Sequence, residues 1–147
     1  MFNIAFDRRQ KVVLVRFSGR FTADDLAGLD DIARVIIEAE DPMDVIFDFS
    51  AAEAVDLTRD AIVRRGQQPQ LQPGQRRAIV APTAAKFELA KLFAQSQSAA
   101  GSTPPLVTRS LDEALRGFGR TALETHPIEI DWLREELQAA RDSLRGA

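Results

Sequence analysis

The stretch Val45-Ile46-Phe47-Asp48-Phe49 is apolar at every position except Asp48. A short and nearly continuous apolar run of this kind is typical of a central strand that is covered on both faces of a sheet. Asp41-Pro42 lies just before it and predicts the end of a helix, because the residue before a proline disfavours the helical conformation. We therefore take this run as the middle of a sheet and interpret the chain outward from it.

Two strand-like segments and one helical segment precede the central run. Residues 2–6 alternate between apolar and polar or small side chains, and residues 12–17 are largely apolar, so the two predict an antiparallel hairpin. Ser18-Gly19-Arg20 is expected to end the second strand. Thr22 and Asp25 have the spacing of a capping box, which predicts that a helix begins there. Its apolar face is formed by Leu26, Leu29, Ala33 and Ile36.

Helices and strands alternate after the central run. The elements that we expect are a helix over 58–65, a Gln- and Pro-rich loop over 67–74, a strand over 77–81, a helix over 83–97, a weak strand over 106–108 and a helix opened by a capping box at Ser110–Glu113. Alternation of this kind predicts parallel strands joined by right-handed crossovers. The expected fold class is α/β, with a mainly parallel sheet of about five strands, an N-terminal antiparallel hairpin, covering helices and a C-terminal amphipathic helix.

The pattern also predicts the core. The residues that we expect there are Leu26, Leu29, Ile36, Val45, Phe47, Val80 and Phe93. Replacing Phe47 by Ala is expected to cost about 3–5 kcal/mol, as for a large side chain in a packed core.

Composition restricts the class of protein. The chain has 147 residues, a hydrophobic fraction of 45% and no cysteine, which is typical of one globular domain and excludes disulfides and thiolate nucleophiles. The net charge of −3 provides no overall attraction to nucleic acid or to an anionic membrane. The N-terminus lacks the pattern of a signal peptide, and no apolar run approaches a membrane span, so we expect a cytoplasmic protein without membrane insertion.

Several of these segments, in this order, resemble the STAS superfamily, and within it the SpoIIAA-like relatives of anti-sigma-factor antagonists. The similar segments are residues 15–22, 45–50, 78–82 and 110–115. The resemblance covers roughly residues 2–119. It implies a STAS-like domain over residues 1–120, followed by a linker and an amphipathic helix over 121–147.

The resemblance also implies a candidate switch residue. In the antagonists, an Asp-Ser-Ser-Gly motif after the central strand carries a serine that a partner kinase phosphorylates. Counting from Asp48 places Asp56-Leu57-Thr58-Arg59 over that motif, so Thr58 is the candidate phosphoacceptor and Asp56 matches the aspartate. Leu57 and Arg59 depart from the motif. The residues alone favour a simpler role for Thr58, because a threonine at a helix start caps the helix.

Basic residues surround the Gln- and Pro-rich loop. They are Arg59, Arg64, Arg65, Arg76 and Arg77, and Asp60 opposes them. With Asp56, the first three are our candidate contacts for an anion or a partner, and the patch suits an anion, an acidic partner or a lipid headgroup. The alternative is a solvated helix face beside a charged strand edge.

Catalytic and metal-binding patterns are missing from the sequence. The chain has one histidine, His126, which precedes Pro127 and is interpreted as a linker residue. Asp48 and Asp56 would suggest acid chemistry only if they met, and each is explained as a cap of a loop or helix start. We expect no metal, no cofactor and no enzymatic activity. The leading hypothesis is a regulatory protein–protein interaction module with a kinase or anti-sigma type of partner, and the alternative is a carrier of a lipid or small molecule.

The tail is predicted to be an amphipathic helix over 128–145. Its apolar positions are Ile130, Trp132, Leu133, Leu137 and Leu144. Because the stripe is too short to be stable alone, the helix must dock. We expect a homodimer in which it packs across the two-fold axis, with docking on its own subunit as the alternative.

Overall fold

The fold is described from a computed structural model. It describes the backbone of residues 1–120, 122–127 and 130–145, and their side chains except at positions 126, 127, 130–134, 136, 137 and 140. The elements in chain order are β1 (Phe2–Asp7), β2 (Val12–Phe21), α1 (Ala23–Ala39), β3 (Asp44–Val55), α2 (Arg59–Gly66), β4 (Arg77–Val80), α3 (Ala84–Ala99), β5 (Leu106–Thr108), α4 (Leu111–Gly117), β6 (His126–Pro127) and α5 (Ile130–Arg145).

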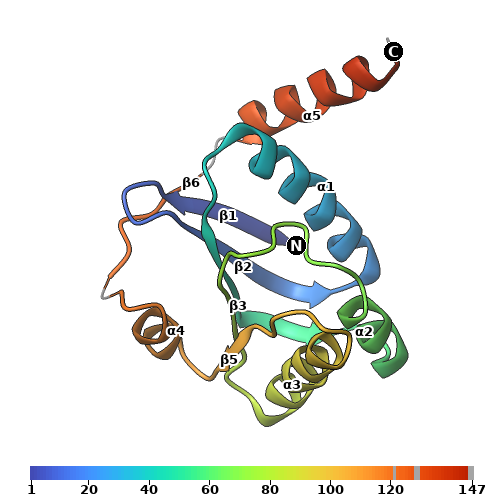
Figure 1. Cartoon of the computed structure of the whole chain (residues 1–147), viewed down its shortest axis with the longest axis vertical. Coiled ribbons are helices and arrows are strands. Elements are labelled where there is room, and N and C mark those ends of the chain that lie inside the picture. Colours follow the sequence, from blue (N-terminus) through green and yellow to red (C-terminus); the bar gives the residue numbers. More distant parts are fainter. Residues whose placement is uncertain (121, 128–129, 146–147) are drawn as a thin grey trace.

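The strands form one mixed sheet in the order β5-β4-β3-β2-β1-β6 (Figure 1). β1 and β2 pair antiparallel, whereas β2, β3, β4 and β5 pair parallel. The predicted α/β fold with an N-terminal hairpin is confirmed. Each parallel strand lies one step further along the sheet than its predecessor, so right-handed crossovers place α1, α2 and α3 on the same face.

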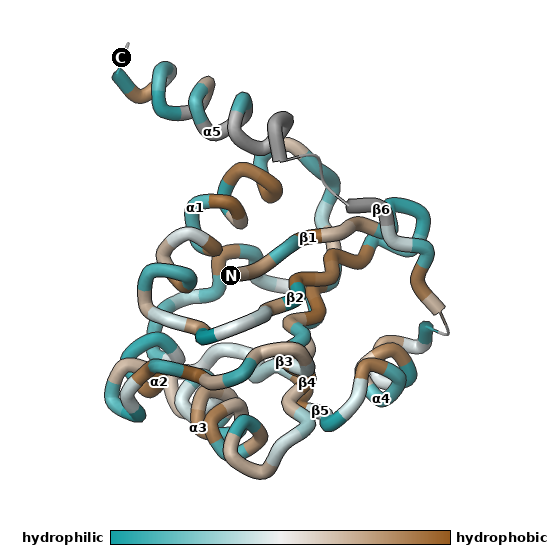
Figure 2. Tube along the Cα trace, turned by 180° about the vertical axis from the view of Figure 1, so that it is seen from behind, coloured by the Kyte–Doolittle hydropathy of each residue, from teal (hydrophilic) through white to brown (hydrophobic). Residues whose placement is uncertain are grey.

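The two faces of the sheet have different covers. On the first, which we call the three-helix face, β1 and β2 pack against α1, and β4 packs against α3. On the second, the α4 face, alternate residues of β2, β3 and β4 pack against α4. The buried residues of the α4 face are Val12, Leu14, Ile46, Ala78, Val80, Ala114, Leu115 and Phe118. Figure 2 shows the hydrophobic positions gathered on the central strands.

The predicted end of β2 at Ser18-Gly19-Arg20 is wrong. β2 continues to Phe21 and β3 to Val55, with register shifts between Arg16 and Ser18 and between Gly19 and Arg20. Gly19 has a φ of +65°, a left-handed conformation that glycine adopts without a steric penalty. The turn-forming residues therefore make irregularities within the strand and do not end it.

The predicted core divides into two groups. Leu29, Ile36 and Val80 are buried, as expected. The others, which are Leu26, Val45, Phe47 and Phe93, are partly buried, and all four line a cavity on the three-helix face. On the three-helix face, β3 is therefore only partly covered, since Val45, Phe47 and Phe49 pack against the neighbouring clusters and also line the cavity.

The two predicted capping boxes also differ. At Thr22 the box is complete, because Thr22 Oγ1 accepts from the Asp25 N–H and Asp25 accepts from the Thr22 N–H at 2.9 Å. The Thr22 N–H and the N-terminal ammonium hold the pKa of Asp25 below its usual value. At Ser110 only half of the box forms, since the Glu113 carboxylate accepts from the Arg109 N–H.

The segment after α4 returns along β1. Buried Asp7 accepts hydrogen bonds from the backbone N–H of Gln10 and of Glu124, both at 3.0 Å. The Gln10 side chain donates to the Ala122 carbonyl at 2.6 Å. His126, interpreted above as a linker residue, belongs to β6, whose backbone pairs antiparallel with β1. The segment beyond residue 120 is thus joined to the sheet.

The last helix, α5, contacts α1. Figure 1 shows α5 crossing near the C-terminal end of α1 and extending past the rest of the fold. No helix within the described ranges is long and apolar enough to cross a membrane.

Candidate functional site

Thr58 lies at the carboxyl-terminal end of the parallel strands, where it opens α2. The Asp56 N–H donates to the Phe21 carbonyl at 2.7 Å, which ties this connection to the end of β2. Thr58 Oγ1 accepts from the Ala61 N–H at 3.0 Å, so the predicted capping role is confirmed. The residue is exposed, so its hydroxyl is open to a partner.

Charged residues flank Thr58 in the chain and follow it on α2. Asp56 pairs with Arg20 at 3.2 Å, and both side chains are more than half exposed, so the pair adds little stability. Arg59 and Arg64 are exposed and have no carboxylate within ion-pair distance among the described residues. We call Arg20, Asp56, Thr58, Arg59 and Arg64 the Thr58 surface.

The other arginines of the predicted basic patch separate. Arg65 makes a two-pronged ion pair with Asp30 of α1. Arg76 and Arg77 are neighbours at the start of β4, so their side chains point to opposite faces. Arg76 donates to Asp44 at 2.9 Å, and its guanidinium lies 4.9 Å from the ring of Phe118 on the α4 face. The prediction of one continuous basic patch is therefore wrong.

An apolar cavity of about 300 Å³ lies on the three-helix face over β3. Its floor is formed by Val45, Phe47 and Phe49, and its walls come from α1 on one side and α3 on the other. α1 packs mainly over β1 and β2, and α3 packs over β4, so β3 lies between the two helices. Leu57 and Ile62 line the end of the cavity near Thr58. Residues 68–72 of the Gln- and Pro-rich loop line the opposite end, toward the amino-terminal ends of the strands.

The charged residues of the cavity lining are mostly cations. They are Asp30, Arg34, Asp41, Arg65, Arg77 and Lys86. Two of these cations have only neutral hydrogen-bond partners among the described residues. Arg77 donates to Gln97 Oε1 and to the Thr103 carbonyl, both at 2.7 Å, and Lys86 donates to the carbonyls of Phe49 and Ala52. Burial lowers the pKa of Arg77.

The two aspartates considered for acid chemistry do not meet. Asp48 accepts from the Ser50 N–H at 2.9 Å and from its hydroxyl at 2.6 Å, and it lies beside Arg16 of β2. Asp56 belongs to the Thr58 surface. Asp48 therefore stabilises the irregularity within β3 where its register with β2 shifts, and it does not cap a loop or a helix start as the sequence predicted. In the part of the chain that the structure describes, no group of three or more His, Asp or Glu side chains could hold a metal.

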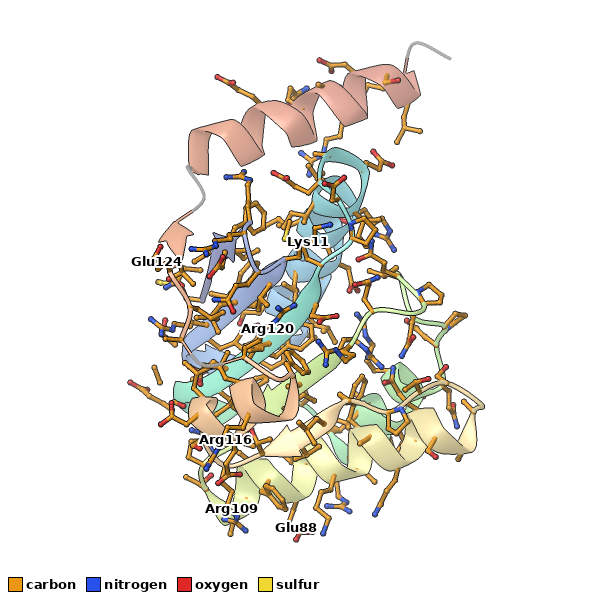
Figure 3. The ribbon with its side chains drawn as sticks, turned by 60° about the vertical axis from the view of Figure 1, so that its left-hand side comes forward. Lys11, Glu88, Arg109, Arg116, Arg120 and Glu124 are labelled. Carbon is orange, nitrogen blue, oxygen red and sulfur yellow. The ribbon has the colours of Figure 1, made fainter. Side chains whose placement is uncertain are left out.

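The cations of α4 and of the residues just after it were not predicted as site residues. Figure 3 labels Arg116 and Arg120 there. Arg116 is exposed, whereas Arg120 Nε is buried without a hydrogen-bond partner among the described residues.

The candidate dimer contacts are only partly described. The side chains of Ile130, Trp132, Leu133 and Leu137 lie outside the described residues. Leu144 is 80% exposed on α5. The contact between α5 and α1 agrees with docking on the same subunit, and the homodimer stays a prediction.

Comparison with known proteins agrees with the architecture. No family model and no curated protein matches the sequence. Among solved structures, the chain is similar to the anti-sigma factor antagonist SpoIIAA in its unphosphorylated form, with a TM-score of 0.51 and 11% sequence identity. The match covers 81% of this chain and 97% of SpoIIAA. The protein therefore has a SpoIIAA-like STAS fold, as the order of its motifs predicted.

Two features of this region were not predicted from the sequence. One is the cavity, because an apolar alternation looks the same whether it faces a helix or a void. The other is the pair of polar side chains in its lining, Lys86 and Gln97, which stand among ordinary helical residues of α3. Gln97 is only 3% exposed, and no sequence signal distinguishes it from an exposed glutamine.

Proposed function

We propose that the protein is a non-enzymatic regulatory module that binds another protein through the Thr58 surface. The observation that carries the proposal is the exposed hydroxyl of Thr58 at the start of α2, on a SpoIIAA-like fold. The surrounding arginines favour an acidic partner, because Arg59 and Arg64 have no carboxylate partner among the described residues.

Phosphorylation of Thr58 would switch this surface. A phosphate adds nearly two negative charges beside Arg59 and at the positive end of the α2 dipole. The phosphate would therefore pair with the arginines of this surface that are proposed to bind the acidic partner. The expected consequence is release of an acidic partner from the phosphorylated form.

Affinity capture of the tagged full chain from its native cells tests the interaction. We expect a specific protein that is lost when Arg59→Glu and Arg64→Glu are combined. Arg9→Glu is a matched control, since Arg9 is exposed in the hairpin turn at the opposite end of the sheet. Equal capture by all three forms would show that the partner does not use the Thr58 surface. Phosphopeptide mapping of the same material would detect phosphate on Thr58.

A second candidate function is a carrier of an apolar ligand. The observation that favours it is the cavity over β3, whose volume of about 300 Å³ lies at the lower end of the range for small-molecule sites. Native mass spectrometry of the purified protein tests this function. A retained mass adduct that is lost when Ala33 of the lining is replaced by Phe would support it, and the bare chain mass throughout would count against it.

A further inference from the structure

The amino-terminal end of the cavity combines a cation with an apolar channel. Arg77 begins β4 and pairs in register with Val45, the first floor residue of β3. Its side chain points to the three-helix face, where it lines the cavity together with buried Gln97. A guanidinium is therefore held at one end of an apolar space.

Arg77 has unused hydrogen-bonding capacity. A guanidinium carries five N–H donors, and both described hydrogen bonds of Arg77 come from Nη2. Their acceptors, Gln97 Oε1 and the Thr103 carbonyl, are neutral, and no carboxylate lies within ion-pair distance among the described residues. Because an arginine stays protonated in proteins, its partial burial leaves a charge that a bound anion would compensate.

A comparison with the other cations of the cavity lining indicates that an anion would bind at Arg77. Arg65 is neutralised by Asp30, and Arg34 has Asp31 at 3.6 Å. Lys86 lies toward the other end, where the carbonyls of Phe49 and Ala52 accept from its ammonium. Arg77 is partly buried and lies at the amino-terminal end of the cavity. Unlike Arg65 and Arg34, it has no carboxylate partner among the described residues, and unlike Lys86, it does not donate to carbonyls of β3.

The size of the cavity restricts the ligand. The floor from Val45 to Phe49 extends about 13 Å along the strand, at roughly 3.3 Å per residue. This length fits a single alkyl chain of medium length.

We infer that the cavity binds a single-chain aliphatic carboxylate, with its carboxylate on Arg77 and its chain along Val45, Phe47 and Phe49. This inference rests on the second candidate function, that of a carrier. It adds the ligand class, the orientation and the residue that selects the charge. A charge-assisted hydrogen bond from the Arg77 Nε–H or Nη1–H to the carboxylate would give this selection.

Isothermal titration of the full chain with decanoate and with decan-1-ol tests the inference, because the two probes share a chain and differ in charge. We expect decanoate to bind at least roughly tenfold more tightly than decan-1-ol, as for a hydrogen bond to a charged group. Arg77→Gln should remove this preference and leave the affinity for decan-1-ol unchanged. Arg64→Gln is the matched control, since it removes one exposed cation that does not line the cavity.

The outcomes separate the inference from the carrier function. If neither probe binds the wild type, both the carrier function and the inference are overturned. If both probes bind equally and Arg77→Gln changes neither affinity, the cavity stands as a site and the assignment of the carboxylate to Arg77 is wrong. Thermal unfolding checks that Arg77→Gln folds, and Arg77→Lys, which keeps the charge, should retain part of the preference.

Discussion

Replacing Phe47 by Ala tests whether the space over β3 exists in solution. Phe47 forms part of the cavity floor and is partly exposed. Phe17 of β2 also borders the cavity, but its side chain is packed, with 1% exposure and ring centroids of Phe49 and Phe21 at 4.3 and 4.8 Å. The two substitutions therefore remove the same atoms from two environments.

The expected losses differ. Phe17→Ala should lower the free energy of unfolding by about 3–5 kcal/mol, since it removes a fully packed ring and leaves a void. Phe47→Ala should cost only about 1–3 kcal/mol, because full burial of such a side chain is worth about 1.5–3 kcal/mol and part of its neighbourhood is already empty. This value replaces the larger loss for Phe47 that the sequence predicted.

Urea unfolding followed by circular dichroism measures both losses. Phe6→Ala is the control, because Phe6 is also 1% exposed and should behave like Phe17. An unchanged m-value would show that the comparison concerns stability and not a change in the unfolded state. Equal losses for Phe47→Ala and Phe17→Ala would refute the reasoning, since Phe47 would then be fully packed and the cavity closed.

Thr58, Asp7 and the C-terminal helix offer three further tests. Thr58→Ala should cost about 1 kcal/mol by removing the cap of α2, and Thr58→Ser should be nearly neutral, as measured by thermal unfolding. The Gln10 and Glu124 N–H groups hold the pKa of Asp7 below its usual value of about 3.9, so its contribution is complete above about pH 4 and is lost as the pH falls through the lowered value. The difference in unfolding free energy between wild type and Asp7→Asn should therefore shrink between pH 6 and pH 3, and a constant difference would count against this role. In sedimentation equilibrium, the full chain should be a dimer and a chain ending at Thr125 a folded monomer. If both the full chain and the truncated chain are monomers, the prediction of a homodimer is wrong.

The sequence was sufficient for the order of elements because local signals agreed with one another. Alternation over residues 2–6, the cap at Thr22 and the stop at Asp41-Pro42 each act within a few residues and need no tertiary information. The extension of β3 to Val55 was missed for the opposite reason. Ser50-Ala51-Ala52 has weak strand propensity, and pairing with β2 imposes the extended conformation.

The candidate site was only partly predictable. Thr58 was found as a candidate site residue through the resemblance, and its capping role could be predicted because a cap depends on local geometry. The separation of Arg76 from Arg77 follows from strand alternation and could have been anticipated once β4 was assigned. The cavity could not, since it arises from the distance between α1 and α3 across β3, and no local pattern encodes the distance between two helices. The pairing of Arg65 with Asp30 depends on the same arrangement.

The most direct test of the proposed function is site-specific photocrosslinking in the native cells. A photoreactive phenylalanine analogue placed at position 60, in the first turn of α2 and close to Thr58, should crosslink the chain to one discrete protein. The same analogue at position 9, at the opposite end of the sheet, should not capture that protein, and Thr58→Glu should abolish the crosslink from position 60. Identical crosslinks from both positions, or a crosslink that persists with Thr58→Glu, would contradict the claim that the Thr58 surface binds a regulatory partner.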